Sequence, residues 1–153
     1  MKKILLSVFM VLSIYIYSDT CASGMYQIES GIVYYGFDMN PNPDIVNIEK
    51  KEEINGADSK TFKEMVDYGK DKNNVYYEGK KVKNADAKTF EILGYTPQYI
   101  FTAVCYFYGK DEKNIYYKGV ILKEADVNTF KVSGAYEAED KDYNYKGNER
   151  TKK

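Results

Sequence analysis

The amino-acid sequence predicts a mainly β protein with short helical turns, in which tandem antiparallel hairpin repeats of about 40 residues form one small domain. Three observations predict this class. The stretch YGKDKNNVYYEGKKVKNADAKTFEILG at residues 68–94 returns at residues 108–134 with 14 identical positions. Tyrosine and β-branched residues, which favour strands, are separated by short polar turns. The 153 residues suffice for one hydrophobic core.

Residues 1–22 are predicted to be a signal peptide. Two lysines precede an apolar run from Ile4 to Tyr17, and small and polar residues follow. This is the pattern of a secretory leader, and the run is short for a membrane span. We therefore expect an exported bacterial protein that is periplasmic, outer-envelope or secreted. Lipid attachment at Cys21 is the alternative to simple removal, although YSDT matches poorly the small apolar residues expected before a lipidated cysteine.

The rest of the chain is predicted to form one repeat domain over residues 23–147, followed by a flexible tail at 148–153. The tail contains no apolar residue. A formal net charge of −1 provides no basic footprint for nucleic acid, and no later segment could span a membrane. Cys105 lies in the apolar stretch YIFTAVCYFYG, so we expect it to be buried, with a reactive thiol as the alternative.

Each repeat unit is predicted to form a hairpin. YGKD ends one strand, the following polar residues turn, and VYYEG or IYYKG returns. Asp, Asn and Gly tolerate the backbone conformations that such turns need. The predicted turn residues are Asp71, Asn74 and Gly79 in one unit and Asp111, Asn114 and Gly119 in the other. Because successive side chains of a strand point to opposite faces, one tyrosine of each pair is expected to face the core and one the solvent.

A second motif, AD-x-x-TF, occurs at residues 57–62, 85–90 and 125–130. It predicts a short helical turn in which the aspartate caps the amide of the threonine, as in Asp86 with Thr89 and Asp126 with Thr129. The phenylalanine is expected to pack on the core. Degenerate units are predicted around residues 31–62 and 139–147, since terminal repeats are usually atypical. The apolar run from Tyr95 to Phe107 predicts a central strand.

At these residues the chain resembles the DKNYY family of bacterial exported repeat proteins, whose motif is present as DKNNVYY and DEKNIYY. The resemblance covers residues 68–134, and earlier residues match only in fragments. Both copies insert two residues, Asn74-Val75 and Asn114-Ile115, before the tyrosines. The resemblance implies an envelope or surface protein and transfers no catalytic residue.

The sequence predicts no catalytic residue, no cofactor and no metal site. It contains no histidine, which removes the commonest general base and metal ligand. DKNN offers oxygens as half a calcium loop would, but it lacks the glycine and closing glutamate, so turn chemistry explains it better. Carboxylate-only hydrolysis stays open, because carboxylate pairing is invisible in one sequence.

The leading functional hypothesis is a non-enzymatic, exported binding protein with an exposed tyrosine face made by Tyr76, Tyr77, Tyr116 and Tyr117. Exposed tyrosines provide flat amphipathic contact area, and the expected partner is an unknown protein or a cell-envelope glycan. Cross-strand packing is the structural alternative for the same residues. The other hypotheses are an inhibitor or immunity-type protein that binds a specific partner through the loop Phe37–Asn55, and a small carboxylate-dependent hydrolase.

Overall fold

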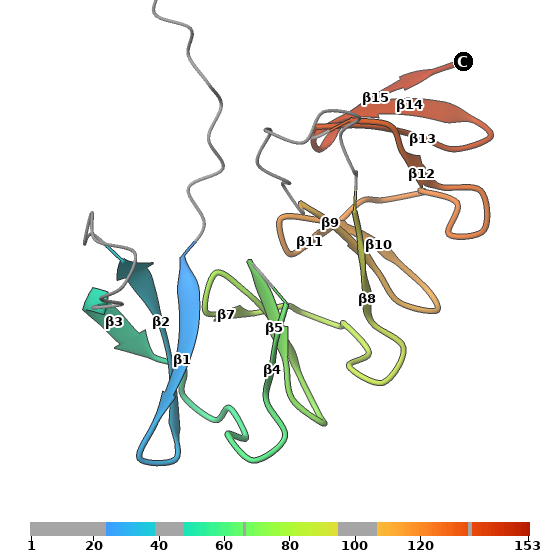
Figure 1. Ribbon diagram of the computed structural model, residues 1–153. Coiled ribbons are helices and arrows are strands. Elements are labelled where there is room, and N and C mark those ends of the chain that lie inside the picture. The colour runs from blue at the N-terminus through green and yellow to red at the C-terminus, as the bar shows by residue number, and fades with distance from the viewer. Residues whose placement is uncertain (1–23, 39–47, 66, 95–106, 135) are drawn as a thin grey trace, which may run out of the picture.

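The computed structural model describes residues 24–38, 48–65, 67–94, 107–134 and 136–153. These residues form fifteen strands in four small antiparallel sheets, which lie side by side along a curved row (Figure 1). The prediction of a β protein built from consecutive hairpins is confirmed. No helix occurs in the described residues, so the AD-x-x-TF segments are turns rather than the short helices that we predicted.

In every sheet the strands follow their order in the chain. The first sheet consists of β1 (Met25–Glu29), β2 (Ile32–Asp38) and β3 (Ile48–Glu53). The second consists of β4 (Lys63–Met65), β5 (Tyr68–Lys70), β6 (Val75–Tyr77) and β7 (Lys80–Lys81). The third consists of β8 (Glu91–Leu93), β9 (Tyr108–Lys110), β10 (Ile115–Tyr117) and β11 (Val120–Ile121). The fourth consists of β12 (Lys131–Val132), β13 (Glu137–Glu139), β14 (Tyr143–Lys146) and β15 (Glu149–Lys152).

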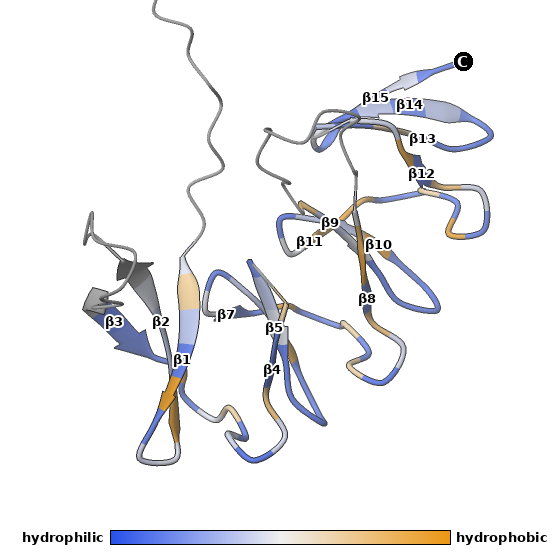
Figure 2. Cartoon of the chain, viewed as in Figure 1, coloured by the Kyte–Doolittle hydropathy of each residue, from blue (hydrophilic) through white to orange (hydrophobic). Residues whose placement is uncertain are grey.

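The hydrophobic core lies between consecutive sheets, and tyrosine is its main residue. Most of the chain is hydrophilic on the Kyte–Doolittle scale, with hydrophobic colour in short segments such as β8 and β12 (Figure 2). One cluster joins the first two sheets through Tyr26, Val33, Tyr35, Ile54 and Tyr76. The next joins the second and third through Tyr68, Val75, Tyr77, Val82, Ala87, Phe90 and Tyr116. The last contains Tyr108, Ile115, Leu122, Phe130, Ala138 and Tyr145.

The turn residues predicted from the repeat lie where expected. The amide of Asp71 bonds to the carbonyl of Asn74 at 3.0 Å, and Asp111 and Asn114 repeat this bond. Gly79 and Gly119 both have a φ of 73°, which glycine adopts without a steric penalty. These turns set the hairpin register that places Tyr77 opposite Tyr68 and Tyr117 opposite Tyr108.

A buried aspartate at each of these hairpins fixes the turn that leads into the sheet. In the third sheet, Oδ2 of Asp111 accepts hydrogen bonds from the amide of Asp86 (2.9 Å) and the hydroxyl of Tyr116 (2.6 Å). Its Oδ1 accepts from the amides of Lys113 and Asn114, both at 2.8 Å. We call this arrangement the aspartate bracket. It joins the AD-x-x-TF motif of one unit to the hairpin of the next.

The bracket recurs in the second and fourth sheets. Asp71 accepts from the amides of Asp58 (3.0 Å), Asn73 and Asn74 (both 2.7 Å) and from the hydroxyl of Tyr76 (2.9 Å). Asp140 accepts from the amides of Asp126 (3.0 Å), Asp142 and Tyr143 (both 2.8 Å) and from the hydroxyl of Tyr145 (2.6 Å). Burial disfavours each charged carboxylate, but the donors outweigh it and lower the pKa of all three aspartates, to about 2 for Asp140.

The AD-x-x-TF residues mainly serve this connection. Asp126 accepts from the amide of Thr129 at 3.0 Å, as predicted for a cap, whereas Asp86 accepts from the amide of Lys88 at 2.9 Å. The Oγ1 of Thr89 accepts from the amide of Glu112 (3.2 Å), which lies in the next hairpin. The phenylalanine packs on the core as predicted. A Cβ at Gly109 would lie 2.5 Å from Cζ of Phe90, so only glycine fits beneath that ring.

Three tyrosine hydroxyls also link each sheet to the next. The hydroxyl of Tyr68 donates to the carbonyl of Phe107 (3.1 Å) and accepts from the amide of Gly119 (3.0 Å). We call this a tyrosine staple. Tyr26 makes the equivalent bonds to the carbonyl of Asp67 (3.1 Å) and the amide of Gly79 (3.2 Å), and Tyr108 donates to the carbonyl of Tyr136 (2.8 Å).

Tyr68 and Tyr77 form a matched pair for testing the staple. We expect Tyr68→Phe to lower the free energy of unfolding by about 1–3 kcal/mol, because it leaves the partly buried amide of Gly119 and the buried carbonyl of Phe107 without their shared partner. The hydroxyl of Tyr77 is buried and has no hydrogen-bond partner in the described part of the chain. Tyr77→Phe should therefore leave stability unchanged or raise it by about 1 kcal/mol. Urea denaturation measures both, and equal losses in the two variants would contradict the staple.

The fourth sheet ends the row with a different pair. The staple tyrosines lie opposite a second tyrosine in the first three sheets, as Tyr26 with Tyr35, Tyr68 with Tyr77 and Tyr108 with Tyr117. At the same place in the fourth sheet, Glu137 lies opposite Lys146. A charged pair is suited to a face that no further sheet covers, as in the terminal repeats of other arrays. We call Glu137 and Lys146 the charged cap.

The predicted flexible tail at residues 148–153 is wrong. β15 occupies Glu149–Lys152 and pairs with β14 along four residues. The guanidinium of Arg150 also bonds to the carboxylate of Glu124 (2.6 Å) and contacts the ring of Tyr143 at 4.6 Å. Backbone pairing thus orders a segment that has no apolar side chain, which composition alone could not indicate.

Two other predicted segments are only partly described. The loop Phe37–Asn55 is largely strand at its ends, because β2 extends to Asp38 and β3 pairs with it from Ile48. Of the predicted central strand, only Phe107 is described, and it lies directly before β9. The predicted signal peptide at residues 1–22, with Cys21, lies outside the described residues, as does Cys105.

Candidate binding groove

The predicted outward row of tyrosines is not present. Tyr76 is 2% exposed and Tyr116 is fully buried, and both hydroxyls bond to bracket aspartates. Tyr77 is also buried, and Tyr117 is half-buried. The premise of one solvated face was wrong, because each interior sheet is covered on both faces. Tyr76 therefore packs against the preceding sheet and Tyr77 against the following one.

A groove lies between the second and third sheets, where β7 runs beside the turn that connects β10 to β11. Buried Tyr77 and Val82 form its floor together with Gly119. Lys80 and Lys81 line it from β7. Glu78, Lys118 and Val120 also line it. The groove therefore combines three lysines, one exposed glutamate and an apolar residue, Val120, that is 64% exposed.

The lysines of the groove are not neutralised by carboxylates. Among the described residues, the ion pairs within 4.0 Å use other cations, such as Lys110 with Glu91 and Arg150 with Glu124. The ammonium group of Lys118 lies 4.5 Å from the ring centroid of Phe107 and 5.8 Å from that of Tyr117. Aromatic rings thus hold this charge beside the groove without cancelling it.

Behind the groove lies an unusual carboxyl group. Asp67 is 3% exposed, at a position where the next two units have Phe107 and Tyr136. Burial and, to a smaller extent, the neighbouring charge of Glu78 raise its pKa to about 6, against the opposing effect of Lys118. The carbonyl of Asp67 is fixed by the hydroxyl of Tyr26 and the amide of Glu78, so its backbone is held in place.

Asp67→Asn is expected to stabilise the protein at neutral pH only. A carboxyl whose folded pKa is raised favours the folded state below the unfolded pKa, near 4, and loses that contribution as pH rises through about 6. The neutral amide avoids burying the charge, so we expect a gain of about 1–3 kcal/mol at pH 7.5 and almost none at pH 4. Urea denaturation at both values measures this, and a pH-independent difference would contradict the raised pKa.

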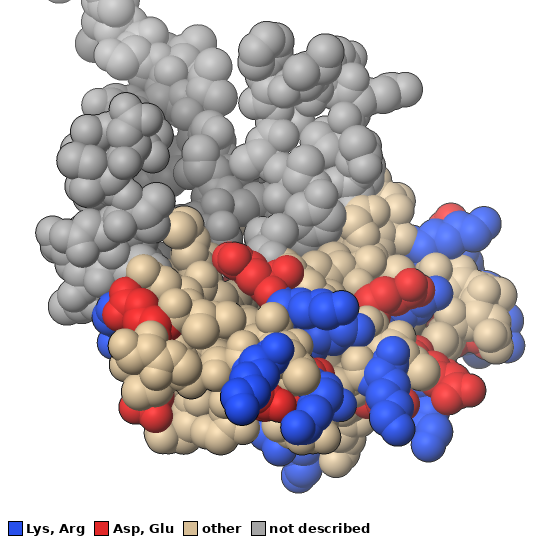
Figure 3. All heavy atoms as spheres, turned by 60° about the horizontal axis from the view of Figure 1, so that its bottom comes forward, with Lys and Arg blue, Asp and Glu red and all other residues tan. Residues whose placement is uncertain are grey.

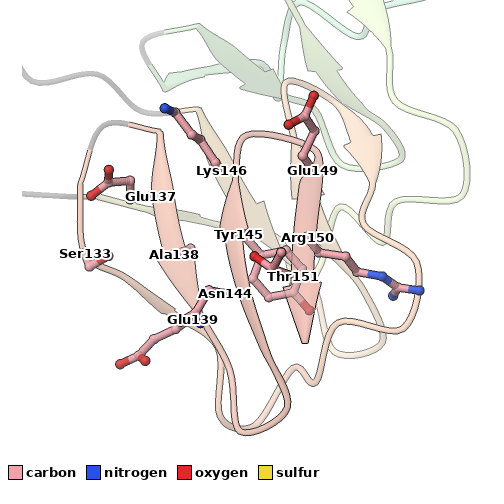
Figure 4. A pocket seen from close by; sticks show the side chains of 10 residues that line it. All are labelled: Ser133, Glu137, Ala138, Glu139, Asn144, Tyr145, Lys146, Glu149, Arg150 and Thr151. Atoms are coloured by element: carbon pink, nitrogen blue, oxygen red, sulfur yellow. The ribbon is translucent and has the colours of Figure 1, made fainter. Parts of the chain in front are cut away.

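A second hollow lies over the fourth sheet and is lined by the charged cap (Figure 4). Its other charged residues are Glu139, Glu149 and Arg150. Charges of both signs alternate there, and Arg150 is already bonded to Glu124. This hollow has three acids against two bases, whereas the groove beside β7 has three lysines against one acid, so the groove has the larger charge excess and is the stronger candidate for binding a charged partner.

The predicted turn residues show no sign of metal binding. The carboxylates of Asp71 and Asp111 are occupied by backbone amides, as turn chemistry requires. The described segments contain no cluster of three or more histidine, cysteine or acidic residues that could hold a metal ion. They also contain no helix long and apolar enough to cross a membrane.

Sequence reasoning missed the groove residues, although one signal was present. When the two full units are aligned, Glu78 corresponds to Lys118 and Lys80 to Val120. Both positions are exposed in both units, whereas the tyrosines shared by the units are largely buried. Differences between repeats therefore pointed to the outer surface better than their shared tyrosines did.

Comparison with known proteins gave one match. The model of the DKNYY family matches residues 9–100, which is more than half of the chain. The match includes the first full unit and the region before it, which we had related to the family only in fragments. No curated protein and no solved structure was found to be similar.

Proposed function

The chain belongs to the DKNYY family, and on that premise we propose that it is an exported, non-enzymatic envelope or surface protein that binds a partner along the edge of its stacked sheets. Export rests on the leader-like residues 1–22, with two lysines before an apolar run. A binding role rests on the surface. The tyrosine face that we first considered is replaced in this proposal by the exposed residues around β7 and the β10–β11 turn.

One observation supports the binding role above all others. Positions that hold the repeats together are the same in both full units, while several exposed positions change their charge, and side chains of both signs lie on the surface (Figure 3). Lys72 corresponds to Glu112, and Glu78 to Lys118. A uniform scaffold with a varied surface suits recognition, because the outer residues can differ without disturbing the brackets and staples.

Three of the four buried acids, the bracket aspartates, support a non-enzymatic role, whereas the pKa of the fourth, Asp67, is raised to about 6. The three bracket aspartates accept several hydrogen bonds each, and their pKa values are lowered, so they are poor proton donors near neutral pH. The alternative contact, the loop Phe37–Asn55, has its central residues 39–47 outside the described part of the chain. The groove is therefore the surface on which we base the proposal.

Site-specific crosslinking in the bacterium that makes the protein tests this function. A photoreactive amino acid is placed at Lys80 or Val120, both in the groove, and in parallel at Lys60 or Lys88, both exposed in AD-x-x-TF turns. We expect a discrete crosslinked product from the groove positions only, and in the envelope or extracellular fraction. Equal products from all four positions, no product from the groove, or a cytoplasmic protein would contradict the proposal.

A further inference from the structure

We propose that the groove beside β7 binds an extended acidic polypeptide segment, which adds to the open edge of the second sheet. This inference rests on the proposed function and specifies its partner. It combines the charge of the groove, the free backbone edge of β7 and the exposed side chain of Val120.

Charge favours an acidic partner. Lys80, Lys81 and Lys118 line the groove against a single exposed acid, Glu78. The corresponding groove between the third and fourth sheets is lined by Lys123 and Arg150, and there Arg150 is bound to the carboxylate of Glu124 and the carbonyl of Lys123. The cations beside β7 are therefore available to an incoming carboxylate, whereas Arg150 is already paired.

The backbone favours a polypeptide over an anionic glycan. β7 is the last strand of its sheet and pairs only with β6, so its outer edge has no strand partner in the described structure. A strand end of this kind can hydrogen-bond an added peptide backbone, while the side chains set its specificity. Acidic residues of the segment would meet the lysines, and an apolar residue would cover Val120.

The groove is also preformed. The staple from Tyr68 to the amide of Gly119 fixes the β10–β11 turn against the second sheet. A Cβ at Gly119 would lie only 2.8 Å from Cβ of Tyr77, so the turn lies directly on the floor of the groove. A partner would thus meet two walls already held in position, which reduces the entropy lost on binding.

Fluorescence anisotropy with labelled octapeptides tests the inference. The first probe alternates Glu and Val, and the second alternates Lys and Val. The full exported chain should bind the acidic probe and not the basic one. We expect Lys80→Gln/Lys81→Gln to weaken binding about tenfold or more, while the matched control Lys60→Gln/Lys88→Gln changes it less than about twofold. All four lysines are exposed, so both variants should fold, which circular dichroism verifies.

A third probe separates edge pairing from simple charge attraction. The acidic octapeptide with alternate backbone nitrogens methylated keeps its charges but loses donors, and it should bind about tenfold more weakly than the first probe. Equal binding of both acidic probes, or equal losses in both lysine variants, would overturn the inference. The inference would also be overturned if a sulfated glycan such as heparin bound in a way that required Lys80 and Lys81 while the acidic peptide did not bind.

The two proposals fail in different ways. If groove positions crosslink to a partner but the acidic octapeptide does not bind, the stated chemistry of the partner is wrong and the binding role stands. If no groove position crosslinks, the proposed function itself fails, whatever the peptides do.

Discussion

Asp111→Ala is expected to cost about 3–5 kcal/mol of the free energy of unfolding, because it removes the acceptor of five hydrogen bonds at once. Three backbone amides would lose this partner, and the buried hydroxyl of Tyr116 would keep only its longer bonds to the carbonyl of Asn84 (3.4 Å) and from Nδ2 of Asn114 (3.3 Å). One of those amides belongs to Asp86, so the third sheet would also lose one of its connections to the turn that leads into it, while the bond between the amide of Glu112 and Oγ1 of Thr89 would remain. Such a loss is a large part of the stability of a small domain.

Urea denaturation of three variants tests the bracket. Asp111→Asn keeps the shape and one acceptor oxygen, so we expect about half of the alanine loss. Glu112→Ala removes a neighbouring exposed acid and should stay within about 0.5 kcal/mol of wild type. A loss below about 1 kcal/mol for Asp111→Ala would show that the bracket does not stabilise the junction.

The bracket also predicts how stability depends on acid. The folded pKa values of Asp71, Asp111 and Asp140 are lowered, so the unfolded chain binds protons at higher pH than the folded chain does. Their stabilisation is complete above the unfolded pKa, near 4, and decreases as pH falls towards the folded values. We expect wild type to lose stability steeply from pH 4 to pH 2, and Asp111→Asn to lose less over the same range.

Glu137→Tyr/Lys146→Tyr is expected to make the protein self-associate through the exposed face of its fourth sheet. The change recreates the tyrosine pair that the first three sheets direct at their neighbours, on a face that no further sheet of the described residues covers. Each exposed ring offers about 150–250 Å² for burial, so molecules should associate through this face. Analytical ultracentrifugation should show an average mass above that of wild type, increasing with concentration.

Added tyrosines elsewhere provide the control for this variant. Lys72→Tyr/Lys113→Tyr introduces the same two side chains at exposed hairpin turns, away from the charged cap. This control should sediment like wild type. If the variant Glu137→Tyr/Lys146→Tyr also sediments like wild type at every concentration, the charged cap is not what prevents molecules from associating through the fourth sheet.

Local parts of the fold could be predicted from the sequence, and longer-range parts could not. The turns at Gly79 and Gly119 follow from the residues that form them. The bracket could not be predicted, because Asp86 and Asp111 are 25 residues apart and neither of their motifs indicates that the other is its partner. The sequence was instead interpreted as a helix cap, since a local partner is the simplest for an aspartate in that pattern.

The candidate site was harder to predict, because it depends on how the sheets stack. Alternation along a strand correctly separates Tyr76 from Tyr77, but it does not say that both sides are covered. Because both faces are covered, the tyrosines that were predicted to form a binding face lie in the core instead. Asp67 was also missed, since it lies one residue before the aligned units, and the bonds that the carbonyls of Asp67 and Phe107 accept from Tyr26 and Tyr68 show that the two positions are equivalent.

The tyrosine staples make the row of sheets directional, and this determines where a further repeat could be added. Every staple runs from one sheet to the next in the chain, and the charged cap closes the far end. A repeat added by duplication would therefore continue this pattern if it were inserted before the cap. A second copy of residues 68–107 inserted after residue 107 would supply its own staple, bracket and turn, so the protein can grow from its middle while both ends keep their sequence.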